Sequence, residues 1–67
     1  MNNALRGQRI REARLKKGLS LRGLSKPLAV SFQAISHWEQ GLHTPNVRYF
    51  PVLAEVLDIP VISLVVE

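Results

Sequence analysis

Four residues between positions 31 and 41 have the side chains and the spacing to read a nucleic acid. On a helix over 32–40 they share one face: Phe32, Gln33, Ser36 and His37. An amide can form two hydrogen bonds with adenine, an imidazole can bond guanine or a phosphate, and an aromatic ring can contact a thymine methyl group. A face needed only for solubility would normally be charged, and this one has no lysine or glutamate. The set predicts contacts with base edges; the alternative is an ordinary exposed face with a half-buried Phe32.

Other chemistry has little support in the sequence. His37 and His43 are six residues apart, and without cysteine or clustered carboxylates they are far from a zinc ligand set. Ser31, Ser36 and Glu39 have a histidine nearby, but the chain lacks a glycine-rich nucleophile elbow and is too small for a pocket-sized core. We therefore expect no metal, no cofactor, no small-molecule substrate and no enzymatic activity.

Length and composition favour one small helical domain over residues 1–67. The chain has 67 residues and no cysteine, so neither a disulfide nor a thiolate metal site supports it. A chain of this size buries roughly 60% of its unfolded surface, and helical bundles provide the compact local packing that it needs. No apolar run approaches the ~20 residues of a membrane span, and the first residues lack the apolar core of a signal peptide. We expect a cytoplasmic protein, associated with the nucleoid if prokaryotic.

Charge is divided unevenly along the chain. Residues 1–26 carry eight of the nine basic groups and one acid, a net charge of +7. Residues 27–67 carry one basic group and four acids, a net charge of −3. A basic pole of this kind is typical of a protein that binds a polyanion. A basic helix that is merely soluble is the alternative explanation.

Capping residues and apolar spacing predict a first helix over 4–17. Asn2 or Asn3 can cap its start, and Gly18 can take the left-handed conformation at its end. Its apolar side consists of residues three to five positions apart: Leu5, Ile10 and Ala13. The remainder of this helix is basic.

A second helix should span 21–28, with Ser20 as its N-cap. The leucines expected to face inward are Leu19, Leu24 and Leu28. Pro27 should end this helix early or distort it near Lys26, because proline inside a helix costs about 3 kcal/mol.

A third helix should span 32–40, between Ser31 as its N-cap and Gly41 at its end. The residues expected on its inner side are Ala34, Ile35 and Trp38. A fourth helix should span 48–57. Its apolar side consists of Phe50, Leu53, Ala54 and Leu57.

In this order, the residues resemble the Cro/C1-type helix-turn-helix family, close to the N-terminal domains of lambdoid phage repressors. The first matching residues are Gly7, Ile10, Arg11, Arg14, Gly18, Leu19, Ser20, Leu24, Val30 and Ser31. The match continues with Ala34, Ile35, Ser36, Trp38, Glu39, Gly41, Pro45, Leu53, Ala54 and Leu57. The likeness spans nearly the whole chain in the expected order and spacing. It implies an all-α, lambda-repressor-like domain of four or five helices with a helix-turn-helix over about 20–41.

The resemblance implies that the third helix enters the major groove of double-stranded DNA, and that two copies bind a palindromic operator. The implied function is a sequence-specific transcriptional regulator, in particular a repressor. Arg14 and Glu39 stand at two positions that form an internal ion pair in relatives. Three residues depart from the family pattern. Leu21 replaces a glutamine that touches a phosphate, Ala29 replaces a glycine in the turn, and Pro27 is atypical.

Phosphate contacts need cations and backbone N–H groups. The candidates lie at the first, second and fourth helices: Arg11, Ser20, Leu21, Arg22, Asn46 and Arg48. Arg48 is the one basic residue after position 26, and in relatives its position faces the same way as the motif. We expect Arg6, Arg9 and Lys26 to contribute mainly to the long-range field and to solubility.

The segment 57–66 carries more apolar side chains than a small core can hold. They are Ile59, Val61, Ile62, Leu64, Val65 and Val66. An exposed patch of this size usually marks an interface, so we expect a homodimer through this segment. The alternative is that the segment closes the domain as a short fifth helix, as the resemblance implies, although its β-branched residues also suit a strand.

A second class of function is compatible with the same fold. The domain could be a protein-interaction module, such as an antitoxin that binds a toxin partner. Leu21, Phe32 and the apolar tail would then form the contact. Affinity for DNA should fall steeply with salt, whereas a protein complex of this kind would be insensitive to salt.

Overall fold

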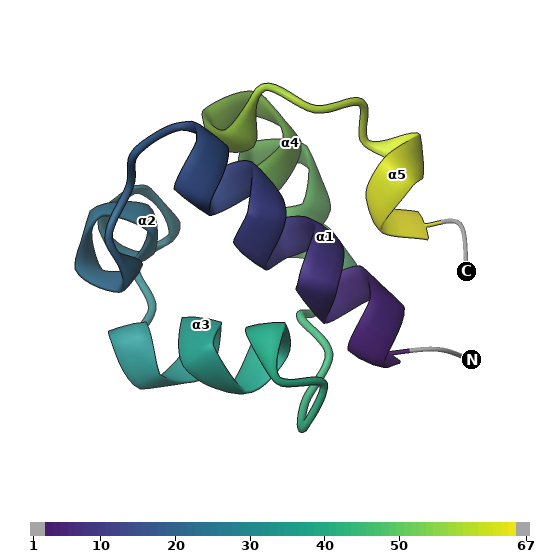
Figure 1. Ribbon diagram of the computed structural model, residues 1–67, viewed down its shortest axis with the longest axis horizontal. Helices are drawn as coiled ribbons and strands as arrows, with labels where there is room; N and C mark the ends of the chain where they lie inside the picture. The colour runs from purple at the N-terminus through teal and green to yellow at the C-terminus, as the bar shows by residue number, and fades with distance from the viewer. Residues whose placement is uncertain (1–2, 66–67) are drawn as a thin grey trace.

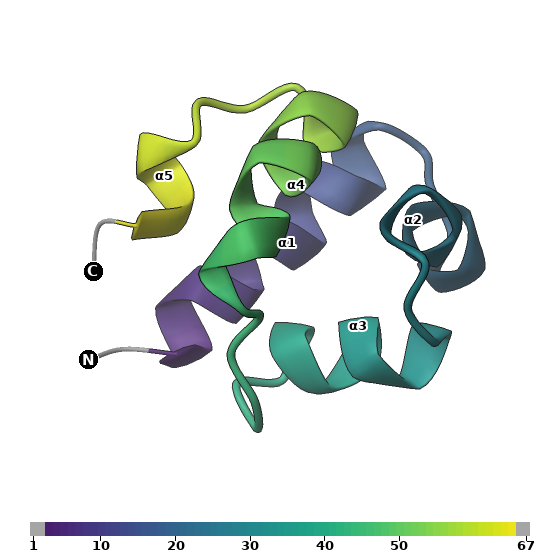
Figure 2. The same ribbon diagram turned by 180° about the vertical axis from the view of Figure 1, so that it is seen from behind.

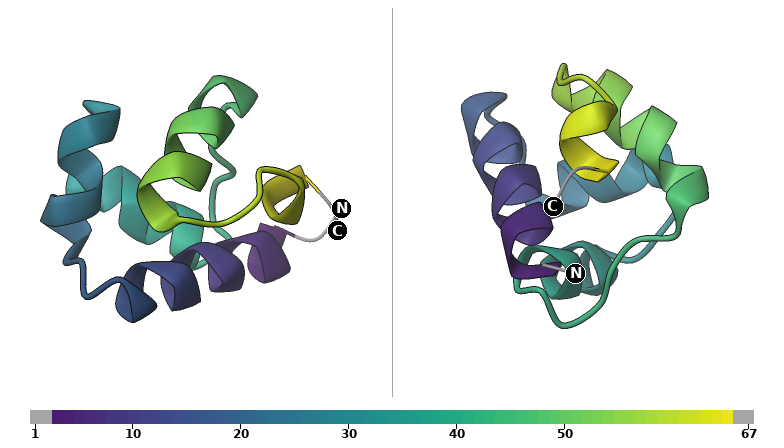
Figure 3. Two further views of the ribbon diagram at one scale, coloured as in Figure 1. Left: turned by 90° about the horizontal axis from the view of Figure 1, so that it is seen from above. Right: turned by 90° about the vertical axis from the view of Figure 1, so that its right-hand side faces the viewer.

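The computed structural model describes residues 3–65, which form five α-helices and one short 3-10 turn. The elements are α1 (Asn3–Lys16), α2 (Leu21–Leu28), α3 (Phe32–Glu39), the 3-10 turn η1 (Val47–Tyr49), α4 (Phe50–Leu57) and α5 (Ile62–Val65). No strand occurs in this part of the chain, so the predicted all-α fold of four or five helices is confirmed. Helices α2 and α5 lie toward opposite ends of α1, and α3 lies along one edge of the molecule (Figures 1 and 3).

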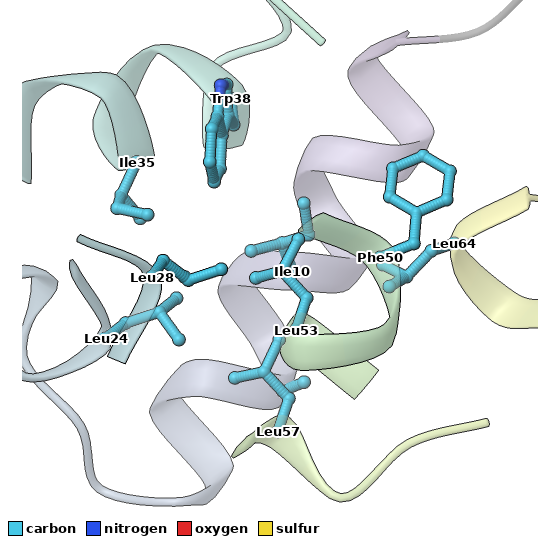
Figure 4. Close-up of a cluster of buried hydrophobic side chains, with 10 residues drawn as sticks. Ile10, Leu24, Leu28, Ile35, Trp38, Phe50, Leu53, Leu57 and Leu64 are labelled. Carbon is cyan, nitrogen blue, oxygen red and sulfur yellow. The ribbon is translucent and has the colours of Figure 1, made fainter. Parts of the chain in front are cut away.

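All five helices contribute to one small core. The fully buried side chains are Ile10 from α1, Leu24 from α2, Ile35 from α3, Leu53 and Leu57 from α4, and Leu64 from α5. Figure 4 shows these side chains converging, together with Leu28, Trp38 and Phe50. Burying one such side chain contributes about 1.5–3 kcal/mol. In a domain of this size every helix is therefore needed to complete the core.

Each of the helices α1 to α4 is followed within two residues by a residue in the left-handed conformation. These residues are Gly18, Ala29, Gly41 and Asp58, with φ of 72°, 56°, 77° and 57°. At the end of α2 the Ala29 N–H donates to the Lys26 carbonyl at 3.1 Å, and the Val30 N–H donates to the Ser25 carbonyl at 3.3 Å. This is the Schellman arrangement, in which glycine is preferred because a Cβ is unfavourable there by roughly 1–2 kcal/mol. The prediction for Gly18 is confirmed.

Pro27 does not end α2 early, so that part of the prediction is wrong. The helix continues through Pro27 to Leu28. The next residue explains why, because Leu28 is only 5% exposed and packs in the core. Its burial stabilises the domain by about 1.5–3 kcal/mol, which is comparable to the cost of a proline inside a helix. The ring of Pro27 itself lies on the surface.

The tail forms the helix α5 rather than a strand, and two arginines of α1 anchor it. Arg6 Nε donates to the Leu64 carbonyl at 2.6 Å, and Arg6 Nη1 donates to Thr44 Oγ1 at 2.7 Å. Arg9 Nη1 donates to the Ser63 carbonyl at 2.9 Å. These bonds hold α5 beside the N-terminal half of α1 (Figure 3). We expected Arg6 and Arg9 to act mainly through the long-range electrostatic field and solubility. That expectation is wrong, because both side chains donate hydrogen bonds to backbone carbonyls of α5. Carbonyls at a helix end need such donors.

Helices α1 and α3 are in close contact at Gly7. A Cβ at this position would collide with the carbonyl oxygen of Trp38 and would lie 2.7 Å from that of Glu39. The atoms that it would meet belong to the backbone of α3, so they cannot move aside as a flexible side chain would. Gly7 therefore sets the distance between the two helices. Of the two asparagines predicted to cap α1, Asn3 lies within the helix and Asn2 lies outside the described residues.

We predict that Gly7→Ala destabilises the domain by about 1–3 kcal/mol, the usual cost of overpacking. Alanine is intrinsically the better helix former by about 1 kcal/mol, so the collision must overcome that advantage. In the control Gly23→Ala, the nearest atom to the new Cβ is Ser20 Oγ at 3.2 Å. This change should stay within about 1 kcal/mol of the parent. Urea unfolding measures both, and equal stabilities would contradict the close approach of α1 and α3.

We also predict that Ala29→Gly stabilises the domain by about 1 kcal/mol, because glycine relieves the left-handed backbone. Gly18→Ala is the mirror control and should destabilise by a similar amount. A Cβ at Gly18 would meet nothing within 4 Å, so this variant reports backbone conformation alone. Both free energies of unfolding can be measured in one denaturant series. Changes of the same sign in the two variants would contradict this explanation.

Candidate nucleic-acid interface

The outward side of α3 is left open by the other helices. Ser31 Oγ caps the helix by accepting a hydrogen bond from the Ala34 N–H at 3.2 Å. Ile35 and Trp38 are 0% and 6% exposed, so they fix which side of α3 faces the core. In the front and rear views no other helix covers the opposite side (Figures 1 and 2). A rigid helix therefore presents one face to a ligand.

The four predicted base-reading residues divide by exposure into Gln33 and His37, which are exposed, and Phe32 and Ser36, which are half-buried. Ser36 Oγ accepts a hydrogen bond from Gln40 Nε2 at 2.8 Å. The ring of His37 lies beside that of His43, with centroids 5.4 Å apart. Gln40 and His43 thus adjoin this surface, although sequence reasoning did not assign them to it. Gln40 lies four residues after Ser36, and this spacing could have predicted that it shares the same face of α3. His43 lies in a loop, so its position in the sequence did not predict its contact with His37.

The half-buried ring of Phe32 is covered by an arginine from α2. The guanidinium carbon of Arg22 lies 4.4 Å from the centroid of the ring. Arg22 is exposed, and a guanidinium that stacks on a ring keeps its N–H groups at the edge available for hydrogen bonds. The first turn of α2 is therefore joined to the first residue of α3 by two side chains.

The start of α2 offers backbone donors beside this stack. Ser20 Oγ accepts a hydrogen bond from the Gly23 N–H at 2.9 Å, and the Leu24 N–H donates to the Ser20 carbonyl at 3.0 Å. The N–H groups of Leu21 and Arg22 precede these bonds and therefore have no partner within the helix. Such groups suit an anion. The side chain of Leu21 packs against the core, so it would contribute to a phosphate contact through its backbone.

The remaining phosphate candidates lie on other elements. At the start of η1, Asn46 Oδ1 accepts a hydrogen bond from the Arg48 N–H at 3.0 Å, so this N–H is already used. The exposed guanidinium of Arg48 lies 5.0 Å from the centroid of the Tyr49 ring and donates to Tyr49 Oη at 3.1 Å. Arg48 would therefore meet a phosphate with its side chain. Arg11 is exposed on α1.

Arg14 joins α1 to α3 and to the connection that precedes α2. Its Nε and Nη2 lie 2.7 and 3.0 Å from the two carboxylate oxygens of Glu39, and its Nη1 donates to the Leu19 carbonyl at 2.8 Å. The Arg14 and Glu39 side chains are 10% and 6% exposed. The hydrogen bond with Glu39 raises the pKa of Arg14 and outweighs the opposing effect of burial. The charged form of Arg14 is therefore favoured by folding.

The segment around α5 is partly core and partly surface. Leu64 is fully buried, and Ile59 packs against the core. Val61, Ile62 and Val65 are 45%, 58% and 50% exposed. Val66, which was also predicted to lie in this apolar segment, is outside the described residues.

A family model described as Helix-turn-helix matches residues 10–64. The chain therefore belongs to the Cro/C1-type helix-turn-helix family, and it is a DNA-binding domain. Comparison with curated proteins and with solved structures gave no match. Within residues 3–65 no three potential metal ligands gather at one place. No helix in the same range is long and apolar enough to cross a membrane.

We predict that Glu39→Ala lowers the free energy of unfolding by about 3–5 kcal/mol, because it leaves the buried Arg14 guanidinium without its counter-ion. Glu12→Ala is the matched control, since Glu12 is exposed and bonded only across the surface of α1 to Gln8 at 3.2 Å. Its effect should stay within about 0.5 kcal/mol. Thermal unfolding measures both variants. Similar losses in the two would show that the Arg14 pair does not hold α1 to α3.

Proposed function

We propose that the chain is a sequence-specific transcriptional regulator, acting as a repressor, that binds a palindromic operator as a homodimer with α3 in the major groove. The observation that carries this proposal is the uncharged, hydrogen-bonding face of α3. The core side of the same helix is fixed by Ile35, Trp38 and the Glu39 carboxylate. A major groove is wide enough for such a helix, and each base pair presents a distinct pattern of donors and acceptors there.

Base reading is assigned to Phe32, Gln33, Ser36 and His37. Gln33 is exposed in the first turn of α3, where its amide can form two hydrogen bonds with adenine. His37, one turn further along, can bond guanine or a phosphate, and the Ser36 hydroxyl can serve either base type. The Phe32 ring can contact a thymine methyl group. The hydrogen bond from Gln40 to Ser36 supports this role, because it restricts the hydroxyl that would meet the base.

Phosphate contacts fix the register of the helix but carry no sequence information. We assign them to the side chains of Arg11, Arg22 and Arg48 and to the first turn of α2 at Ser20 and Leu21. Asn46 supports Arg48 through its hydrogen bond at the start of η1. The net charge of +7 over residues 1–26 would also draw the domain toward DNA over a longer range.

The segment 57–66 is the candidate dimer interface. Val61, Ile62 and Val65 expose apolar surface there, and the bonds from Arg6 and Arg9 hold α5 against α1. A symmetric dimer through this segment would place two copies of α3 on half-sites related by a two-fold axis. Such half-sites are usually about one helical turn, 34–36 Å, apart.

The protein-interaction alternative has weaker support. It requires Leu21, Phe32 and the tail to form a joint contact surface. Leu21 packs against the core, and Arg22 covers the ring of Phe32. Helices α2 and α5 also lie toward opposite ends of α1 (Figures 1 and 3). One partner would therefore have to extend along the domain to touch all three.

We predict that Gln33→Ala weakens binding to the duplex preferred by the parent by about 1–3 kcal/mol, since it removes a bidentate contact with one base. Affinity for an unrelated duplex should stay unchanged, because that affinity depends on phosphate contacts. Gln8→Ala, which removes an exposed amide from α1, is the control and should change neither affinity. Fluorescence anisotropy at two salt concentrations measures all of these.

Two results would contradict the proposal in different ways. If Gln33→Ala bound the preferred duplex as tightly as the parent, the assigned reading face would be wrong. If no duplex bound with an affinity that falls steeply with salt, DNA would not be the ligand. A salt-insensitive complex with a protein partner would then support the interaction module instead.

A further inference from the structure

The contact between Arg22 and Phe32 lies where the first turn of α2 meets the start of α3. The two residues come from different helices, and the guanidinium carbon lies 4.4 Å from the ring centroid. Arg22 is exposed, whereas Phe32 is half-buried. One face of the Phe32 ring is therefore occupied by a cation, so the ring has less surface to offer a base than an uncovered aromatic side chain would have.

An unrestrained arginine on a surface samples many rotamers, and fixing it on a ligand costs entropy. A guanidinium stacked on a ring has already lost part of that freedom. A guanidinium that lies flat on a ring keeps its N–H groups free at its edge, in the fork that matches a phosphate. The stack also lies beside the N–H groups of Leu21 and Arg22, which have no partner within α2. The Arg22 guanidinium and the backbone N–H groups of Leu21 and Arg22 therefore lie close together at the start of α2.

We infer that Arg22 and Phe32 act as one unit, in which Phe32 holds the Arg22 guanidinium in the orientation that binds a DNA phosphate at the edge of the groove. This inference rests on the proposed function, since it requires α3 to lie in the major groove. Arg22 is the residue that touches the phosphate. Phe32 is a positioning residue that acts through Arg22, and this role replaces the thymine contact assigned to Phe32 in the proposed function. The stack also ties the phosphate contact of α2 to the first residue of α3, and so sets how α3 enters the groove.

The experiment is a double-mutant cycle of Phe32→Leu and Arg22→Ala, measured by affinity for a duplex and by the dependence of that affinity on salt. Phe32→Leu alone should lower affinity about two- to tenfold, which corresponds to the cost of ordering one long side chain. Phe32→Leu should also reduce the salt dependence of the affinity, although no charge is removed. The reason is that Arg22 is then in contact with the phosphate for a smaller fraction of the time. In the Arg22→Ala background, Phe32→Leu should have no further effect. Phe32→Tyr keeps a ring for stacking and should restore the coupling.

Arg48→Ala is the matched control for the cycle. It also removes an exposed arginine that packs on an aromatic ring, but that ring is Tyr49. Phe32→Leu should therefore keep its full effect in the Arg48→Ala background. Circular dichroism and thermal unfolding establish that every variant is folded. Folding is expected because Arg22 and Arg48 are exposed and because leucine or tyrosine keeps an apolar side chain at the half-buried position 32.

The unit is overturned if the effects of Phe32→Leu and Arg22→Ala are additive, or if Phe32→Leu leaves the salt dependence unchanged. Additivity would mean that Phe32 contacts a base directly. These results are separate from a failure of the proposed function, because phosphate binding does not depend on sequence. The cycle can therefore be measured on any duplex that the domain binds. A parent that prefers no sequence would contradict sequence-specific regulation while leaving the coupling of the two residues open to measurement.

Discussion

The buried guanidinium of Arg14 is the constraint on which the position of α3 depends. It bonds both oxygens of Glu39 at the end of α3 and the Leu19 carbonyl before α2, so one side chain of α1 fixes both helices of the motif. A charge in this place must be fully bonded, because an unpaired buried ion is costly. Among the described residues no buried side-chain nitrogen or oxygen lacks a hydrogen bond. The ion pair therefore specifies one arrangement of the helices more than it adds stability.

The orientation of α3 determines what remains on the outside. Gly7 lets the backbone of α3 lie against α1. The burial of Ile35 and Trp38 turns the apolar side of α3 toward the core. The polar residues of the same helix then face away from the domain. The stack of Arg22 on Phe32 joins this face to the start of α2. A helix that is held by Arg14 on one side and linked to the first turn of α2 on the other, where a phosphate is proposed to bind, would lose little entropy on binding.

The sequence predicted most of the helices, because N-caps, glycines and apolar spacing are local signals. It did not predict that α2 would continue through Pro27, since the burial of Leu28 is a property of the assembled core. The roles of Arg6 and Arg9 were missed for a related reason, because their acceptors are 38 to 58 residues away in the chain. Helical spacing was enough to predict which residues form the outward face of α3. It could not predict the contact between Arg22 and Phe32, because that contact depends on how two helices cross.

The open face of α3 is proposed to read DNA sequence as part of a symmetric dimer. Selection of bound duplexes from a random pool tests this most directly, because one consensus reports sequence, symmetry and half-site spacing together. We predict strong enrichment of a palindromic site with half-sites about one helical turn apart. A pool that remains random after repeated selection, although the duplexes bind with steep salt dependence, would contradict sequence reading by α3.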